Sequence, residues 1–422
     1  MKLIPALQHL SVWRTFSDGQ KQQVGELAQN AGGIYFQYHT DYLAYAPSLS
    51  PFNLAFDNRL QVAPQIPHAG LHGVFADSLP DGWGMLLMDS VFRQQGVMPH
   101  QLTPLHRLAF VGQHGVGALS FEPCTHTPVS NESAITLSEL GQQAQAVFAG
   151  QSSEVLVALA QAGGSGGARP KAQVYLKDDI AQHVSIQPQT GYQPWLVKFT
   201  AASLPLAHEE GVCEAAYLTL AQQAGIDVPA WQLIDAPTGK WLAVKRFDCV
   251  GEQGHLHLHS VAGLLDADFR TPSLDYENLI KLGCMLCQSP AVGQALFRRA
   301  VFNLFACNQD DHSKNWAFLQ QDNGQWQLSP AYDITFSPSP YNEHSTAFMG
   351  YGKQPSLKAI QQLAAHANID NWHKAQIIIH EILDALSNWA SVAMRLGVSA
   401  QTTRMIQQQL DKTREENGSL WG

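Results

Sequence analysis

Two aspartates and one asparagine have the side chains and the spacing that phosphoryl transfer requires. Asp310 and Asn315 lie five positions apart in the polar run 308–315, and Asp333 follows after two strand-like segments. This is the Asp-x-x-x-x-Asn spacing of a protein-kinase catalytic loop, in which the carboxylate faces an incoming hydroxyl and the amide oxygen binds a metal ion. A solvated loop whose Asp and Asn only cap turns is the alternative, and it leaves the matched spacing unexplained.

A β-hairpin is predicted between this loop and Asp333. Residues 316–319 and 326–328 are strand-like, and the turn signal Asp-Asn-Gly at 322–324 separates them. Because a hairpin brings its two ends together, Asp333 is expected to return to the mouth of the loop. Its carboxylate then supplies, beside Asn315, a second hard oxygen ligand for Mg²⁺.

A glycine-rich segment is a candidate cover for a nucleotide. Four glycines surround Ser165 in the run 163–167, and Lys171 and the alternating segment 172–176 follow. Backbone N–H groups of such a loop can turn towards phosphate oxygens, and Lys171 adds a cation. The segment is not a Walker A loop, because Gly-x-x-x-x-Gly-Lys-Ser/Thr cannot be matched here. A flexible hinge has the same composition, but the strand that follows favours a loop-then-strand cover over ATP.

Lys198 and Glu214 have the order of the kinase pair that holds the ATP phosphates. Lys198 interrupts the apolar strand 195–199, and Glu214 begins a helix predicted over 214–225. In kinases a strand lysine binds the phosphates and a glutamate of the next helix orients it. A solvent-facing strand lysine is the alternative. Residues 241–248 form another strand, which is either a hinge between two lobes against the adenine or an exposed strand end.

Length and composition describe a globular protein of two or three domains. The chain has 422 residues, of which 45% are hydrophobic and 14% are charged. Its formal net charge of -10 provides no broad electrostatic footprint for nucleic acid, although a local basic patch or a DNA-binding partner stays open.

Several features of the sequence predict a cytoplasmic protein with no membrane partner. Residues 1–5 lack the apolar region of a secretory signal. No apolar run approaches the roughly 20 residues needed to cross a bilayer. The chain has six cysteines and no disulfide-rich composition, so we expect free thiols in a reducing compartment.

The chain divides into three predicted units. A β-rich N-terminal subdomain covers 1–122, an N-lobe with the glycine-rich loop covers 123–250, and a helical lobe with the catalytic loop covers 251–422. A connector that contains Thr, Ser and Pro separates the first two units.

The first unit contains both strand and helix signals. Strand-like runs lie at 22–27, 33–38 and 43–45. The string 75–84 contains a Pro-Asp-Gly turn signature and leads into a helix, which an Asp or Ser of the string can cap. A helix cap does not by itself explain the dense order Asp-Ser-Leu-Pro-Asp-Gly-Trp within this string.

The last unit is predicted to be mainly helical. Helices are expected over 276–287, 294–305, 376–396 and 401–416, and the second of them delivers the catalytic loop at its end. Cys284 and Cys287 lie three positions apart on an apolar helix face, which favours a core position over a metal or redox site.

Three histidines near the start of this unit suggest a second possible site. His255, His257 and His259 alternate with leucines, so that all three imidazoles could share one face of a strand and bind zinc. A half-exposed strand explains the same alternation, and we prefer it.

Together these segments resemble the HipA family of bacterial serine/threonine kinases, the toxins of toxin–antitoxin modules. The likeness covers nearly the whole chain in the expected order. Its motifs lie at 75–84, 164–171, 196–199, 213–214, 245–248, 310–315 and 329–333. The resemblance implies an α+β, two-lobed protein-kinase-like fold with a β-rich HipA-type N-terminal subdomain and a mainly helical C-terminal lobe.

The resemblance also implies roles for individual residues and the cofactors ATP and Mg²⁺. Asp310 is the expected catalytic base, Asn315 and Asp333 are the expected Mg²⁺ ligands, and Lys198 is expected to bind ATP phosphates. The expected nucleotide site comprises Gly166, Gly167, Ala168, Arg169, Pro170, Lys171, Lys198, Glu214, Lys245, Arg246, Phe247, His312, Ser313, Lys314, Asn315, Tyr332 and Asp333.

Members of the family can autophosphorylate a serine of the glycine-rich loop, which ejects the loop and switches the kinase off. Ser165 is the only serine in this loop and is therefore the candidate. Counting back from Lys171, however, Gly164 falls at the usual serine position of the family. A small residue that provides backbone flexibility is the alternative explanation of Ser165.

The expected partners also follow from the resemblance. They are a small helix-turn-helix antitoxin of the HipB type, DNA through that antitoxin, and a protein substrate such as an aminoacyl-tRNA synthetase, with growth arrest and persistence as the consequence. Two other functions stay open: a kinase that acts on a small-molecule alcohol, and a catalytically silent co-repressor in a DNA-bound complex. The intact Asp310, Asn315, Asp333 and Lys198 argue against a silent protein.

Overall fold

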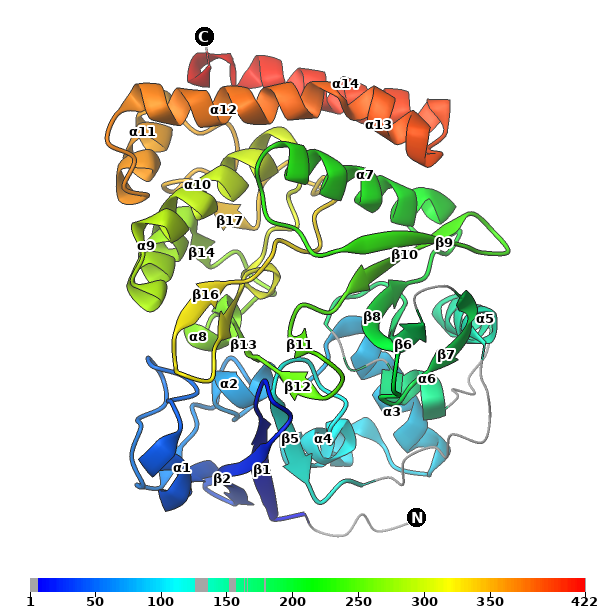
Figure 1. Ribbon diagram of the computed structural model, residues 1–422, viewed down its shortest axis with the longest axis vertical. Coiled ribbons are helices and arrows are strands. Elements are labelled where there is room, and N and C mark those ends of the chain that lie inside the picture. The colour runs from blue at the N-terminus through cyan, green and yellow to red at the C-terminus, as the bar shows by residue number, and fades with distance from the viewer. Residues whose placement is uncertain are drawn as a thin grey trace.

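The computed structural model describes residues 7–125, 136–151, 157–162, 164, 166–177 and 180–421. Figure 1 shows a β-rich N-terminal part at the bottom in blue and cyan, a green sheet on the right, and helices in orange and red at the top. Within these residues no helix is both long and apolar enough to cross a membrane.

The N-terminal part is built on an antiparallel sheet with the strand order β4-β3-β2-β1-β5. The strands are β1 (His9–Thr15), β2 (Lys21–Asn30), β3 (Gly33–Tyr38), β4 (Gln61–Val62) and β5 (Leu119–Glu122). The strands predicted at 22–27 and 33–38 are confirmed.

The prediction of a strand at 43–45 is wrong. These residues end the helix α1 (Thr40–Tyr45), in which Tyr42 is buried and its ring stacks on Tyr38 with the centroids 5.9 Å apart. A short aromatic run has the same apolar content in a strand and in one helical turn, so its pattern alone does not separate the two.

Helices fill the connection between β4 and β5: α2 (Gly73–Ala76), α3 (Gly82–Gln94), a 3-10 helix at Pro99–Gln101 and α4 (Pro104–Val111). The buried side chains Trp83, Leu87 and Val91 of α3 belong to the core of the neighbouring green sheet. Val97, Phe110 and Val111, which follow α3 in the chain, belong to the same core, so the N-terminal part is packed onto the next unit through α3 and the end of α4.

The second unit is a five-stranded antiparallel sheet with the order β7-β6-β8-β10-β9. Its strands are β6 (Lys171–Lys177), β7 (Ile180–Ser185), β8 (Gln193–Lys198), β9 (Trp231–Asp235) and β10 (Lys240–Lys245). The accompanying helices are α5 (Leu137–Phe148), α6 (Val157–Ala162), a 3-10 helix at Ala207–Glu209 and α7 (Glu210–Gln223). The strands predicted around 172–176, 195–199 and 241–248 are thus present, and the helix that carries Glu214 begins one turn earlier than predicted.

The register of this sheet places two lysines side by side. Lys171 of β6 is the direct partner of Lys198 of β8, which also pairs with Leu242 of β10. Directly opposed residues of an antiparallel pair point to the same face of the sheet. Both ammonium groups therefore face the helical part of the molecule.

The third unit is mainly helical, with one large core. Its helices are α8 (Val261–Leu264), α9 (Tyr276–Cys287), α10 (Pro290–Phe305), α11 (Leu357–His366), α12 (Trp372–Ser387), α13 (Trp389–Leu396) and α14 (Ala400–Glu416), with 3-10 helices at Ser313–Asn315 and Gly418–Leu420. The single helix predicted over 376–396 is two helices, because Asn388 interrupts it between α12 and α13. Asparagine is a common helix-boundary residue, since its side chain competes for backbone hydrogen bonds.

Short strands support the loops of this unit. The predicted hairpin is present as β15 (Ala317–Gln320) and β16 (Trp326–Leu328), and β15 also pairs with β13 (His257–Ser260). The other short strands are β11 (Cys249–Val250), β12 (Gly254–His255), β14 (Leu274–Asp275) and β17 (Thr346–Ala347).

The three alternating histidines do not form a common metal site. His255 lies in β12, whereas His257 and His259 lie in β13. His257 Nε2 donates to Leu49 O at 2.8 Å, and His259 Nδ1 donates to Asp77 Oδ2 at 2.6 Å. The zinc hypothesis for these three residues is therefore wrong, because the strand breaks between His255 and His257.

A different group, Asp248, Cys249 and His255, brings its possible ligand atoms within 4.8 Å of one another. Asp248 already accepts from Arg246 Nη2 at 2.5 Å and from Gly117 N at 2.7 Å. A guanidinium at this distance opposes a bound cation, so the group is better explained as a structural ion pair beside a thiol. All six cysteines are free thiols.

We expect His257, which joins β13 to the N-terminal part through Leu49 O, to make the stability of the fold sensitive to acid. Burial, the Arg14 guanidinium and His259 hold the pKa of His257 well below its usual value. The histidine is thus neutral in the folded protein, whereas it takes up a proton in the unfolded chain below about pH 6.5. We expect the free energy of unfolding to fall by about 1.4 kcal/mol for each pH unit below that value through this residue.

Urea unfolding between pH 7.5 and 5 measures this effect. His257→Gln keeps a donor for the Leu49 carbonyl but cannot take up a proton, so it should flatten the pH dependence. The matched control is His380→Gln, on the exposed surface of α12. An unchanged slope in His257→Gln would show that other groups control the acid sensitivity.

Candidate active site

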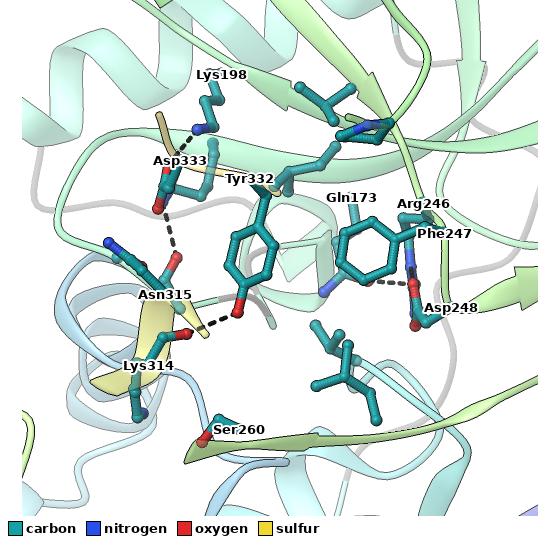
Figure 2. Close-up of a pocket in the computed structure, with 18 of the residues that line it drawn as sticks. Gln173, Lys198, Arg246, Phe247, Asp248, Ser260, Lys314, Asn315, Tyr332 and Asp333 are labelled. Atoms are coloured by element: carbon teal, nitrogen blue, oxygen red, sulfur yellow. Dashed lines mark hydrogen bonds and ion pairs between the residues drawn. The ribbon is translucent and has the colours of Figure 1, made fainter. Parts of the chain in front are cut away.

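Most of the predicted site residues surround one pocket, shown in Figure 2. They come from the glycine-rich loop, the green sheet, helix α7, the catalytic loop and the segment after the hairpin. Those that line the pocket are Gly166, Gly167, Lys171, Lys198, Glu214, Lys245, Arg246, Phe247, His312, Lys314, Asn315, Tyr332 and Asp333.

The other predicted residues do not line this pocket. Arg169 Nη1 pairs with Glu210 Oε2 of α7 at 2.6 Å, and Pro170 O accepts from Phe199 N at 2.9 Å. Ala168 is exposed and Ser313 is buried. Their contact with a nucleotide stays a prediction, and Ser165 lies outside the residues that the structure describes.

Lys198 forms ion pairs with two carboxylates in the pocket. Its Nζ lies 2.5 Å from Glu214 Oε1 and also pairs with Asp333 Oδ1, as Figure 2 shows for the second contact. Burial would lower the pKa of the Lys198 ammonium, but Asp333 and Glu214 raise it above its usual value. The lysine is therefore buried and charged, in the strand-lysine and helix-glutamate arrangement that the sequence predicts, and it is not a solvent-facing residue.

Asp333 stays ionised between two lysines. Burial would raise the pKa of its carboxyl, yet Lys198 and Lys171 hold that pKa well below the usual range. Lys171 Nζ donates to Gly166 O at 2.8 Å, and burial lowers the pKa of its ammonium although Asp333 opposes this change. An ionised carboxylate beside an amide oxygen is a suitable pair of ligands for a hard cation.

The backbone at Asp333 has an unusual conformation, with φ of 55°. The left-handed region is uncommon for residues other than glycine, although Asp and Asn adopt it more readily than most. The preceding side chain holds this turn: Tyr332 Oη donates to Lys314 O at 2.8 Å, and its ring lies 5.6 Å from Phe247. The returning segment is thus tied to the catalytic loop, as the hairpin prediction requires.

The predicted catalytic loop presents Asp310 to solvent and Asn315 to the pocket. Asn315 Nδ2 donates to Asp310 O at 2.7 Å. This hydrogen bond uses the NH₂ group of the amide, so the amide oxygen is not engaged in it. Figure 2 places Asn315 below Asp333. The Asp310 side chain is 65% exposed, with His312 Nε2 at 3.7 Å from its Oδ1. Asp310 does not line the pocket itself, but it lies beside His312 and Asn315, which do, and its carboxylate is open to solvent.

Asp311 holds the loop in place through hydrogen bonds to buried groups. Its buried carboxylate accepts from Tyr276 Oη at 2.5 Å, from His344 Nδ1 at 3.0 Å and from Thr346 N at 3.0 Å. Of the two adjacent aspartates, Asp310 is therefore exposed and Asp311 is structural.

Replacement of Asp311 by alanine is expected to lower the free energy of unfolding by about 3 kcal/mol. The substitution removes the acceptor of three buried donors, and an unsatisfied buried donor is costly. Urea unfolding measures the change. The matched control is Asp310→Ala, whose exposed side chain should contribute less than about 0.5 kcal/mol. Equal effects of the two substitutions would contradict this division of roles.

The predicted hinge end of the pocket is rigidly held. Arg246 Nη1 donates to Gln173 Oε1 at 2.5 Å, and Arg246 Nη2 donates to Asp248 Oδ2 at 2.5 Å. Burial would lower the pKa of the guanidinium, but Asp248 raises it above its usual value. The wall beside Phe247 and Tyr332 is thus fixed by a charge network, and the two rings provide apolar surface suited to a purine.

Sequence reasoning missed several residues of this pocket. They are Asp77, Asp81, Gln173, Asp248 and Ser260. Asp77 and Asp81 belong to the string 75–84, whose unexplained polar density was the available signal. Asp81 is the N-cap residue of α3, and its carbonyl accepts from Met85 N, but its side chain makes no capping hydrogen bond.

Two family descriptions match the chain. "HipA N-terminal domain" matches residues 19–122, and "HipA-like C-terminal domain" matches residues 163–410. The chain belongs to the HipA family. The family resemblance predicted from the motifs is therefore confirmed.

Curated relatives of this HipA-family chain carry kinase names. Y4dM of Sinorhizobium fredii is 30% identical over 225 residues, which cover 48% of the chain and 53% of that protein. A Haemophilus influenzae protein is 26% identical over 191 residues, which cover 42% of the chain and 53% of that protein. The matched part thus spans about half the length of these relatives.

A solved structure extends the HipA likeness over the whole fold. HipA of Shewanella oneidensis MR-1, in complex with HipB and its operator DNA, superposes with a TM-score of 0.70 and 16% identity, and the match covers 97% of this chain and 98% of that one. The predicted α+β HipA-type fold is confirmed.

Proposed function

We propose that this HipA-family chain is an ATP- and Mg²⁺-dependent serine/threonine protein kinase of the toxin type. The observation that carries the proposal is the convergence of Lys198, Glu214, Asn315 and Asp333 on one pocket, with the exposed Asp310 beside the lining residue His312. The kinase names of the curated relatives support the same reaction class.

Each residue has a role that follows from its charge and place. Lys198, charged and oriented by Glu214, attracts the phosphates of ATP, and the apolar wall of Phe247 and Tyr332 holds the purine. Asp310 accepts the proton of the substrate hydroxyl while the hydroxyl oxygen of the substrate bonds to the γ-phosphorus. The bond from that phosphorus to the bridging oxygen breaks, and ADP leaves.

The donor set fits Mg²⁺. The Asp333 carboxylate is kept ionised, and the Asn315 amide has its NH₂ end bonded to the Asp310 carbonyl, so two hard oxygen donors are present at one place. When bound, Mg²⁺ neutralises charge that develops on the phosphate oxygens.

The proposed partners are those of a toxin. The similar Shewanella structure contains HipB and operator DNA. For this chain we infer a helix-turn-helix antitoxin as partner, with DNA bound through it, and a protein substrate such as an aminoacyl-tRNA synthetase, whose phosphorylation arrests growth. Autophosphorylation of Ser165 in the glycine-rich loop is the proposed off switch.

Incubation of the purified protein with Mg²⁺ and γ-labelled ATP tests the reaction. We expect label on protein, and intact-mass analysis with peptide mapping should place one phosphate on Ser165. Label on other residues only, retained in Ser165→Ala, would discard the switch but keep the kinase. Label on metabolites of a cell lysate but on no protein would select a small-molecule kinase instead, and ATP binding without any transfer would select a silent binding protein.

A further inference from the structure

The string 75–84 is the strongest unexplained feature of the molecule, and Asp81 is its central residue. Asp81 is 8% exposed and lies on the wall of the pocket. Its Oδ1 accepts from the backbone N–H of Gly167, in the glycine-rich loop. Its Oδ2 accepts from Lys314 Nζ, in the catalytic loop, at 3.0 Å. One side chain therefore joins two loops that come from different lobes.

The backbone next to Asp81 holds the same loop by further bonds. Trp83 N donates to Gly167 O at 3.0 Å, and the buried Trp83 indole donates to Lys171 O at 2.9 Å. Both polar backbone groups of Gly167 are thus bonded to the start of α3. At Gly82, where φ is 36°, a Cβ would lie 2.8 Å from Ala168 Cα and 2.9 Å from Gly167 O, so only glycine permits this close approach.

Lys314 makes two further contacts, one through its ammonium group and one through its backbone carbonyl. Its Nζ lies 4.5 Å from the centre of the Phe269 ring, and its carbonyl accepts from Tyr332 Oη. Lys314 lies between Asp310 and Asn315 in the catalytic loop. A shift of the Asp81 carboxylate is therefore transmitted to the loop that carries the proposed base and a proposed metal ligand.

Burial would raise the pKa of the Asp81 carboxyl, but Lys314 and the Gly167 N–H lower it, so the group is ionised. An anion is a poor ligand for the phosphates of ATP, because the two repel each other. The carboxylate is therefore suited to holding protein groups in place rather than to binding the nucleotide.

We infer that Asp81 is a positioning residue, which clamps the glycine-rich loop to the catalytic loop and so sets the distance between the nucleotide phosphates and Asp310. The N-terminal part of the chain would then take part in phosphoryl transfer through this clamp. The inference deepens the proposed function and rests on it for its kinetic consequence, whereas the clamp itself can be measured without turnover.

Two substitutions at one position separate the two contacts. Asp81→Asn keeps an oxygen acceptor for Gly167 N–H but removes the charge that pairs with Lys314, and Asp81→Ala removes both contacts. Asp89→Asn is the matched control, since Asp89 belongs to the helix that Asp81 precedes, pairs with Arg107 at 2.6 Å and does not line the pocket.

Three readouts are taken on the full-length protein: amide hydrogen exchange of residues 166–171, the Kd values of ATP and of adenosine, and kcat and KM for transfer. In Asp81→Ala we expect amide exchange of the loop to become about 10- to 100-fold faster, and kcat/KM for ATP to fall by a similar factor. Both changes follow because a charge-assisted hydrogen bond to the backbone is lost. The Kd of adenosine should stay within about twofold, because adenosine lacks the phosphates that the loop covers. Asp81→Asn should be intermediate, and Asp89→Asn should resemble the wild type.

The sign of the change in ATP affinity is decisive. Weaker ATP binding with faster loop exchange supports the clamp. Tighter ATP binding would overturn it, because Asp81 would then act only by charge repulsion. Loop exchange equal to that of Asp89→Asn, or equal weakening of ATP and adenosine, would also overturn it. If the wild type transfers no phosphate, the proposed function fails, and the exchange of the loop still decides whether the clamp exists.

Discussion

Replacement of Asp310 by asparagine is expected to lower the rate of phosphoryl transfer by about 10³-fold. The exposed carboxylate lies 3.7 Å from the pocket residue His312, and asparagine cannot accept the proton of the substrate hydroxyl. Because Asp310 does not line the pocket, the Kd of ATP should change little. Because its side chain is 65% exposed, the free energy of unfolding should stay within about 0.5 kcal/mol. Single-turnover transfer, nucleotide titration and urea unfolding measure the three quantities.

Asp384→Asn is the matched control for this experiment. It changes an exposed aspartate of α12, which Figure 1 shows at the opposite end of the helical part from the N-terminal sheet. It should retain full transfer. Full transfer in Asp310→Asn would remove the assignment of Asp310 as the base, whereas loss of transfer together with unfolding would point to a structural role.

Replacement of Asp333 by asparagine is expected to abolish the effect of Mg²⁺ on ATP binding and to lower transfer by roughly 10³-fold. The substitution removes the negative charge that both Lys198 and Lys171 stabilise. Asparagine tolerates the left-handed conformation at φ of 55°, so the backbone should not be strained. ATP titrations with and without Mg²⁺, followed by transfer assays, measure the two effects.

Asp266→Asn provides a control with the same chemistry and nearly the same backbone. Asp266 also has a positive φ, of 48°, and its carboxylate lies 3.4 Å from His68 Nε2, outside the pocket lining. It should keep both Mg²⁺-dependent binding and transfer. If Asp333→Asn still binds ATP more tightly in Mg²⁺, then Asp333 is not a metal ligand, and its role is confined to the pairing with Lys198.

Local sequence signals predicted the parts of the site that lie close together in the chain. The spacing of Asp310 and Asn315, the Asp-Asn-Gly turn and the strand-like runs on either side of it are sufficient for the loop and the hairpin. Helix α9 has the predicted bounds, because its apolar residues keep the 3.6-residue period throughout.

Three predictions of secondary structure from short or interrupted patterns differ from the structure. The run at 43–45 is helical rather than extended, Asn388 divides a predicted single helix, and the three alternating histidines belong to two strands. At 43–45 a short pattern is compatible with two backbone conformations, and burial of Tyr42 in the same segment accompanies the helix. At Asn388 the side chain bonds to the backbone of the preceding turn and ends the helix.

The sequence by itself determined the family, the order of the motifs and the identity of the catalytic candidates, since these depend on residue type and on spacing along the chain. Only the tertiary structure decided that Lys171 and Lys198 are neighbours on one face of a sheet, and that Asp333 lies between them. It also decided that the Asp81 side chain bonds to Gly167 and Lys314, which are 86 and 233 positions away, rather than to the backbone of the helix it precedes. The physical reason is that an ionised side chain is stabilised by whichever charges and donors the fold brings to it, and distant partners leave no local pattern in the sequence.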